Sequence, residues 1–267
     1  MRSLSATRSL SATFLTAPRV VGLVALVAFL SLATGATAQS LWDDPAFQLA
    51  RQAQEALQRN EYPATVDLAR RAIVEYPDHV WAHYLLAQAA LAQRQWEEAV
   101  ASLTTVTRLY PRSFAAHREL GVAQAQLGRP VEATRAFEAA LALRPDGPDA
   151  EDVKLRLAFL RLHGGDAAGA VPLLTALAEA GTTVPEVWTA LGRLRYEQDQ
   201  LPESERAFRR AAELKDDGKT WFNLAVVRLR LYDKTGAIEA FQRAAVHPEV
   251  REQAVAELGK LGVKPSP

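Results

Sequence analysis

Small and apolar residues recur along this chain at a nearly constant interval. From residue 53 onward, one small residue follows another at spacings of 33 to 37 residues. These residues are Ala53, Ala87, Gly121, Ala158, Gly192 and Ala225. Self-similarity at a fixed period of this length is the sequence signature of a repeat architecture. We therefore expect a linear array of similar units and not one globular core.

Three further columns of residues recur at nearly the same spacings as the first. They are Thr65, Ala99, Ala133, Ala170, Ser204 and Ala237; then Ala69, Leu103, Phe137, Leu174, Phe208 and Phe241; then Ala72, Val106, Ala140, Leu177, Ala211 and Ala244. At 100° per residue, the columns of each unit fall on two separate apolar stripes, one for each of two helices. The small residues predict a close approach of the two helix axes, with the larger residues interdigitating between them.

Turn-forming residues lie between the two predicted helices of each unit. They are Asn60-Glu61, Arg94-Gln95, Gly128-Arg129, Gly164-Gly165-Asp166, Asp199-Gln200 and Tyr232-Asp233. Glycine and asparagine tolerate the left-handed conformation that ends a helix. Proline closes several units and blocks extension of the second helix into the next unit. Each unit is thus predicted to be a helix-turn-helix hairpin.

This pattern resembles the tetratricopeptide repeat, a 34-residue helix-turn-helix unit. The fit is best in the stretches WAHYLLAQAALAQRQWEEAVASLTTVTRLYP and AAHRELGVAQAQLGRPVEATRAFEAALALRP. The resemblance implies an all-α fold, a right-handed superhelical solenoid of about six repeats and a C-terminal capping helix. We expect repeats over 46–79, 80–113, 114–147, 151–184, 185–217 and 218–247, with the capping helix and tail over 248–267.

The first 38 residues have a different character from the repeats. Arg2, Arg8 and Arg19 precede an uncharged stretch from Val20 to Leu32, and small residues ending in Ala36-Thr37-Ala38 follow. This is the layout of a secretory signal peptide, and the apolar run is short for a membrane-spanning helix. We expect 1–38 to be a cleaved signal, with an uncleaved anchor as the alternative, and 39–45 to be a short linker. The protein is then exported, to the periplasm or outside the cell, with a membrane-anchored form possible.

The face of each first helix opposite its packing stripe is not uniformly polar. It carries aromatic, aliphatic and arginine side chains, which are typical anchors of binding interfaces. Our candidate partner-binding residues are Trp81, Tyr84, Gln88, Leu91, Arg118, Val122, Leu155, Phe159, Leu162, Arg193, Tyr196, Phe222, Val226 and Leu229. In the family that the chain resembles, this face lines a concave groove for peptides. An alternative is that some of these side chains only pack against the adjacent repeat.

The predicted partner is a protein or peptide segment, apolar or amphipathic, with some acidic character that meets Arg118 and Arg193. The resemblance also implies a limit, because the positions that clamp a free C-terminal carboxylate in this family carry Ala50, Gln54, Leu85, Ala115 and Glu119. We therefore expect no binding of a free C-terminal acidic tail. Membrane contact is expected only if the N-terminal segment is retained.

The charge balance and the placement of the histidines indicate which classes of function to expect. The 31 basic and 31 acidic residues balance, without a long run of one sign, so nucleic acid is not an expected partner. The five histidines are scattered, and His83 and His117 share one repeat position, which indicates packing and not metal binding. We expect no catalytic residues, no metal and no cofactor. The predicted function is a protein-protein interaction scaffold in the cell envelope; the alternative is an accessory or targeting subunit of an envelope enzyme or of a secretion, pilus or polysaccharide-export complex.

Overall fold

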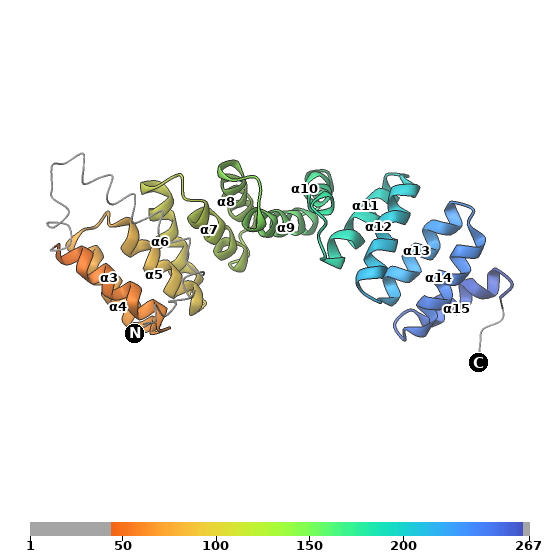
Figure 1. The fold of residues 1–267 in the computed structure, drawn as a ribbon, viewed down its shortest axis with the longest axis horizontal. Helices are drawn as coiled ribbons and strands as arrows, with labels where there is room; N and C mark the ends of the chain where they lie inside the picture. The colour runs from red at the N-terminus through yellow and green to blue at the C-terminus, as the bar shows by residue number, and fades with distance from the viewer. Residues whose placement is uncertain (1–43, 264–267) are drawn as a thin grey trace, which may run out of the picture. The chain divides into compact units, whose positions relative to one another are not determined.

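The computed structural model describes residues 44–263, and over that range every regular element is an α-helix (Figure 1). The thirteen helices of this range, without a strand among them, confirm the all-α prediction. They form two compact units, one ending at Pro111 and the other beginning at Arg112. The expected signal segment 1–38 lies outside the described residues, as do most of the expected linker and the tail from residue 264.

The first unit consists of two helical hairpins. α3 (Pro45–Gln58) pairs with α4 (Tyr62–Glu75), and α5 (Val80–Ala92) pairs with α6 (Trp96–Leu109). α5 also packs against both helices of the first hairpin, so the two hairpins share one core of alanine and leucine side chains. The Asp44 carboxylate caps the start of α3 by accepting hydrogen bonds from the backbone N–H groups of Ala46 and Phe47.

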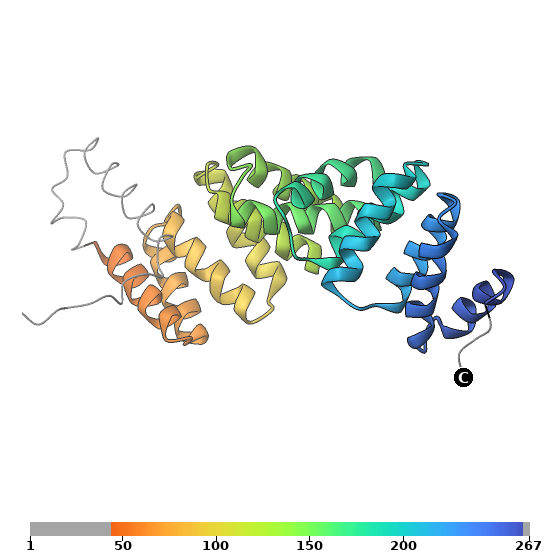
Figure 2. The same cartoon turned by 45° about the vertical axis from the view of Figure 1, so that its right-hand side comes forward.

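The second unit consists of four hairpins and one final helix. The hairpins are α7 (Phe114–Gln126) with α8 (Pro130–Leu143), α9 (Pro148–His163) with α10 (Ala167–Glu179), α11 (Pro185–Glu197) with α12 (Leu201–Leu214), and α13 (Gly218–Arg230) with α14 (Lys234–Val246). The final helix, α15 (Arg251–Lys260), packs on α14 in both views (Figures 1 and 2). It buries Ala254 and Leu258 and leaves its other side exposed, as expected for a capping helix.

The periodic positions found in the sequence are core positions in both units. All members of the four columns are buried, from Ala53 and Thr65 in the first hairpin to Ala225 and Phe241 in the last. A single hairpin has no second surface against which to bury its stripe, so stability comes from stacking neighbouring hairpins. The sequence columns therefore identify the core correctly.

Glycine replaces alanine in the first column at two places where phenylalanine occupies the facing column. A Cβ atom built on Gly121 would lie 2.6 Å from the ring of Phe137, and one built on Gly192 would lie 2.8 Å from the ring of Phe208. Non-bonded carbon atoms prefer roughly 3.5–4.0 Å. At these two hairpins, the aromatic ring occupies the space that a methyl group would need.

The turn inside each hairpin has the left-handed backbone that the sequence predicts. A residue with positive φ ends each first helix, between 58° at Asn60 and 81° at Gly165. The others are Arg94, Gly128, Asp199 and Tyr232. Asparagine and aspartate tolerate this conformation better than other non-glycine residues, so the helix-turn-helix geometry overrides local preference most clearly at Arg94 and Tyr232.

Candidate functional site

The candidate residues of the first unit lie together on α5. Trp81, Tyr84, Gln88 and Leu91 are all half-buried. The ring of Trp81 packs against the ring of Phe47 on α3, with 5.4 Å between the ring centroids. Part of the aromatic surface expected to meet a partner is thus used to hold adjacent hairpins together, as the packing alternative proposes.

The candidate residues of the second unit are distributed over α7, α9, α11 and α13. All of them are half-buried except Arg193, which is exposed. Several also take part in internal packing. Phe222 makes an edge-on contact with Phe241 of its own hairpin at 5.3 Å, and the Arg230 guanidinium lies 5.1 Å from the ring of Tyr196 in the preceding hairpin. These side chains both contribute to the core and present surface to the solvent.

Arg118 differs from the role expected for it. Its side chain is 16% exposed, and its guanidinium lies 3.2 Å from Asp149 and 3.5 Å from Glu119. Asp149 lies in the first turn of α9, 31 residues further along the chain. The charge of Arg118 is therefore balanced within the protein, and it is less available for an acidic partner than its position on the helix indicates.

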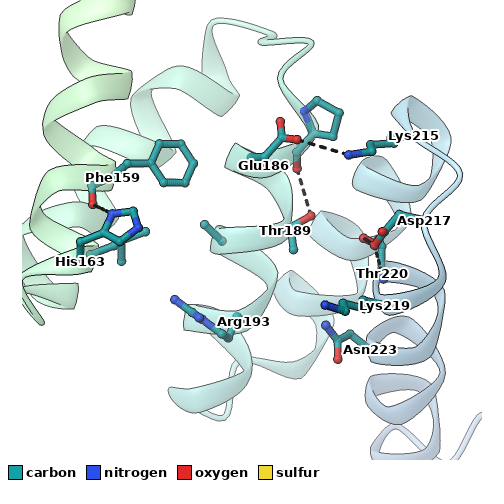
Figure 3. Close-up of a pocket in the computed structure, with 13 residues that line it drawn as sticks. Phe159, His163, Glu186, Thr189, Arg193, Lys215, Asp217, Lys219, Thr220 and Asn223 are labelled. Carbon is teal, nitrogen blue, oxygen red and sulfur yellow. Dashed lines mark hydrogen bonds and ion pairs between the residues drawn. The ribbon is translucent and has the colours of Figure 1, made fainter. Parts of the chain in front are cut away.

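A pocket of about 560 Å³ lies between the first helices of three consecutive hairpins, α9, α11 and α13 (Figure 3). It includes three of the candidate residues, namely Phe159, Leu162 and Arg193. Its other lining residues are His163, Pro185, Glu186, Thr189, Ala190, Lys215, Asp217, Lys219, Thr220 and Asn223. The volume lies within the range of about 300–1,000 Å³ that is typical of ligand pockets.

Both carboxylates of the pocket are already engaged. Glu186 lies 3.7 Å from the Lys215 ammonium. Asp217 caps α13, because its Oδ2 accepts hydrogen bonds of 2.8 Å from the backbone N–H and the hydroxyl of Thr220. Burial alone would raise the pKa of Asp217, but these hydrogen bonds and the positive charge of Lys215 hold it below its usual value. Asp217 is therefore a structural anion.

The cations of the pocket are not all paired. Arg193 lies 3.9 Å from Glu197, and in this pair, as in Glu186–Lys215, both side chains are more than half exposed. Exposed pairs of this kind contribute little to stability. Within residues 44–263, Lys219 forms no ion pair and the carboxamide of Asn223 forms no hydrogen bond. The pocket thus has an excess of positive charge and of hydrogen-bond donors.

Lys219 and Asn223 line the pocket but are not among the residues predicted from the sequence. The spacing of four residues between Lys219 and Asn223 is a signal that locates both on one side of a helix. His163 and Lys215 lie at helix ends, where periodicity gives little guidance. The structure brings these residues together because three hairpins stack in succession.

Other kinds of site are not evident in residues 44–263. Within that range, no group of three histidine, aspartate or glutamate side chains is arranged to hold a metal ion. None of the helices described combines the length and the apolar character needed to cross a bilayer.

Comparison with known families identifies the same repeats. Two family models, both described as tetratricopeptide repeat, match the chain: one over residues 50–101, 84–148 and 189–253, the other over 124–194. Together these matches extend over well more than half of the chain. A search of curated proteins finds no match.

Solved structures of other proteins share the fold. YrrB, described as a TPR protein with an unusual peptide-binding site, is 18% identical with a TM-score of 0.60, over 72% of this chain and 97% of YrrB. MamA from Desulfovibrio magneticus RS-1 is 23% identical with a TM-score of 0.51, over 62% and 92% of the two chains. MamA from AMB-1 is 23% identical with a TM-score of 0.56, over 68% and 96%. At these identities the similarity establishes the fold alone.

Proposed function

The chain belongs to the tetratricopeptide repeat family, and on this premise we propose that it is a non-catalytic scaffold that binds a partner polypeptide along the first helices of its hairpins. The observation that carries the proposal is the pocket between α9, α11 and α13. Three helices of successive hairpins leave a hollow there whose floor is apolar and whose rim is polar. An accessible apolar surface with a polar rim is typical of binding sites on proteins.

The half-buried side chains along the same helices support a polypeptide over a small molecule. Apolar and aromatic residues continue beyond the pocket on α11 and α13, for example Tyr196, Val226 and Leu229. An extended chain contacts several such positions in succession, whereas a small ligand needs one enclosed cavity. The likeness to YrrB, which is described with a peptide-binding site, supports the same class of ligand.

Crosslinking in living cells tests this proposal at the level of single residues. A photoreactive amino acid at Asn223, inside the pocket, is expected to capture a partner protein. The same amino acid at Val131, which is 58% exposed on the second helix α8, serves as the control. Equal capture at both positions, or none at Asn223, would contradict binding along the first helices.

A double substitution provides an independent test. Replacing Phe159 and Leu162, both in the pocket of the second unit, with serine is expected to abolish capture at Asn223 while the circular dichroism spectrum remains helical. Because both side chains are half-buried, the thermal unfolding midpoint must be measured in parallel. Unchanged partner capture by a folded double variant would refute the role of this face.

Export from the cytoplasm forms part of the proposal. The basic start, the uncharged stretch and the Ala-x-Ala ending of residues 1–38 support a cleaved signal, and an envelope location follows from it. N-terminal sequencing of the protein isolated from its own cells is expected to begin at Gln39. A sequence that begins upstream of the apolar stretch in a membrane fraction would support the anchored form, and the same sequence in the cytosol would exclude export.

A further inference from the structure

We propose that the pocket between α9, α11 and α13 selects an acidic side chain inside the bound polypeptide, next to a large apolar side chain that rests on the pocket floor. This inference rests on the proposed function, since it assigns the chemistry of the segment that the scaffold holds. It concerns an internal aspartate or glutamate and not the end of a chain.

The floor of the pocket fits an apolar side chain. Phe159 and Leu162 project from α9 and pack against the core around α11 while remaining half-buried. The small side chain of Ala190 leaves space opposite them on α11. Removing the surface of a further aliphatic or aromatic side chain from water on this floor is favourable.

The charge balance of the rim selects the sign of the neighbouring group. Glu186 is matched by Lys215, and Asp217 is used to cap α13. Lys219 therefore remains uncompensated, and Arg193 has one exposed partner, Glu197, in a pair similar to Glu186–Lys215. A carboxylate would complete this set, whereas a cationic side chain would meet unbalanced positive charge.

The arrangement of donors favours a carboxylate. Figure 3 shows Lys219 and Asn223 side by side on α13, on the side of the pocket that faces α11, where Arg193 lies. Ammonium, amide and guanidinium groups all donate hydrogen bonds, and a carboxylate accepts bonds from several donors at once. Phosphate fits less well, because the Glu186 and Asp217 carboxylates line the same pocket and would repel a dianion.

A contrast within the same unit supports the assignment to this pocket. Arg118 lies on the equivalent face of α7, but Asp149 and Glu119 balance its charge. An acidic side chain is thus expected to be recognised at α11 and α13 and not at α7.

The probe for this proposal is a random peptide library displayed between two fixed domains, so that the selected segments have no free C-terminus. The full chain is expected to enrich sequences with aspartate or glutamate close to a large apolar residue. Replacing that acid with its amide in the most enriched peptide should weaken binding about tenfold, measured by fluorescence anisotropy, as for loss of one charge-assisted hydrogen bond. Added salt should weaken the acidic peptide more than its amide form.

Substitutions in the protein locate the effect. Lys219→Glu should abolish the preference for an acid and favour a peptide with lysine in its place. Lys234→Glu introduces the same charge change on the exposed start of α14, outside the pocket, and should leave the preference intact. An equal loss in both variants, or an unchanged preference in Lys219→Glu, would overturn the assignment of the pocket.

The selection also separates this inference from the proposed function. Enriched peptides without a preference for acidic residues would overturn the inference and leave polypeptide binding intact. Failure to enrich any peptide above an unrelated folded protein of similar size would overturn both.

Discussion

Replacing Gly121 with alanine tests the reason why the repeats alternate between alanine and glycine. The new methyl group would lie 2.6 Å from the ring of Phe137, which is 1% exposed on the facing helix α8. This is about 1 Å less than the roughly 3.5–4.0 Å at which carbon atoms normally rest. Because the ring is buried, it has little room to move away.

Two opposing effects set the size of the change. Overpacking of this kind typically costs about 1–3 kcal/mol. The higher helix propensity of alanine returns about 0.8–1.0 kcal/mol. We expect Gly121→Ala to lower the free energy of unfolding by about 1 kcal/mol, and by no more than about 2 kcal/mol.

A double-mutant cycle isolates the contact between the two residues. Phe137→Leu alone leaves a cavity and should be destabilising. Adding Gly121→Ala to it should restore stability, because the pair then matches Ala87 with Leu103 in the hairpin α5–α6. The coupling free energy between the two substitutions is expected to be about 1–3 kcal/mol, from urea unfolding followed by circular dichroism.

Gly259→Ala on α15 is the matched control. No atom lies within 4 Å of the Cβ position of Gly259, so alanine there should stabilise the chain through helix propensity alone. The last complete hairpin pairs Ala225 with Phe241. There the Phe241 ring lies edge-on to Phe222, three residues before Ala225, whereas Arg118 occupies the position three residues before Gly121. The steric conflict between residue 121 and Phe137 is refuted if Gly121→Ala stabilises the protein as Gly259→Ala does, or if the Gly121 and Phe137 substitutions are additive.

Three further outcomes follow from the caps and the core. His79 caps α5 by accepting a hydrogen bond from the Ala82 N–H, and burial lowers the pKa of His79, although Asp44 opposes this shift and His83 adds to it. The contribution of neutral His79 to the free energy of unfolding is therefore complete above about pH 6.5 and is lost as the pH falls. The thermal unfolding midpoints at pH 7.5 and 5.5 should differ less in His79→Asn than in the unchanged protein, and an equal difference would contradict this. Asp233→Ala removes the side-chain acceptor for the Gly236 N–H and should cost about 1 kcal/mol in chemical unfolding, whereas Asp233→Asn should cost less. Ser204→Ala removes a buried 2.7 Å hydrogen bond to the Gly192 carbonyl and should cost at most about 1.5 kcal/mol; a gain in stability would indicate that the hydrogen bond has no net value.

The sequence predicted the fold well because the repeat period depends on local rules that act in the same way in every unit. The buried columns and the places of the turns, including those at Arg94 and Tyr232, were identified from the repeat period, but the left-handed backbone was expected only at glycine and asparagine. The capping helix α15 runs from Arg251 to Lys260, inside the range 248–267 that we expected for the capping helix and the tail. The first helix likewise begins at Pro45, one residue earlier than the expected start of the repeats.

The sequence predicted the candidate site less completely because the site depends on contacts between hairpins. Spacing placed Arg118 on the spare face of its helix, but it gave no indication that Asp149 would reach the guanidinium across 31 residues. The same spacing placed Arg193 and Phe159 on that face without indicating that both line one pocket with Asn223. Periodicity predicts the side of a helix that a residue occupies, but it does not predict which charges the neighbouring helices bring.

The match between glycine and phenylalanine limits how these repeats can recombine. An exchange of chain segments in the connection between two hairpins keeps Gly192 with Phe208 and Ala158 with Leu174. An exchange within a hairpin turn would instead combine glycine with leucine, which leaves a void, or alanine with phenylalanine, which creates an overlap unless the ring is placed as Phe241 is beside Phe222. Crossovers during gene duplication, or in engineered chimaeras, should therefore survive mainly at hairpin boundaries, so that whole hairpins are inherited as single parts.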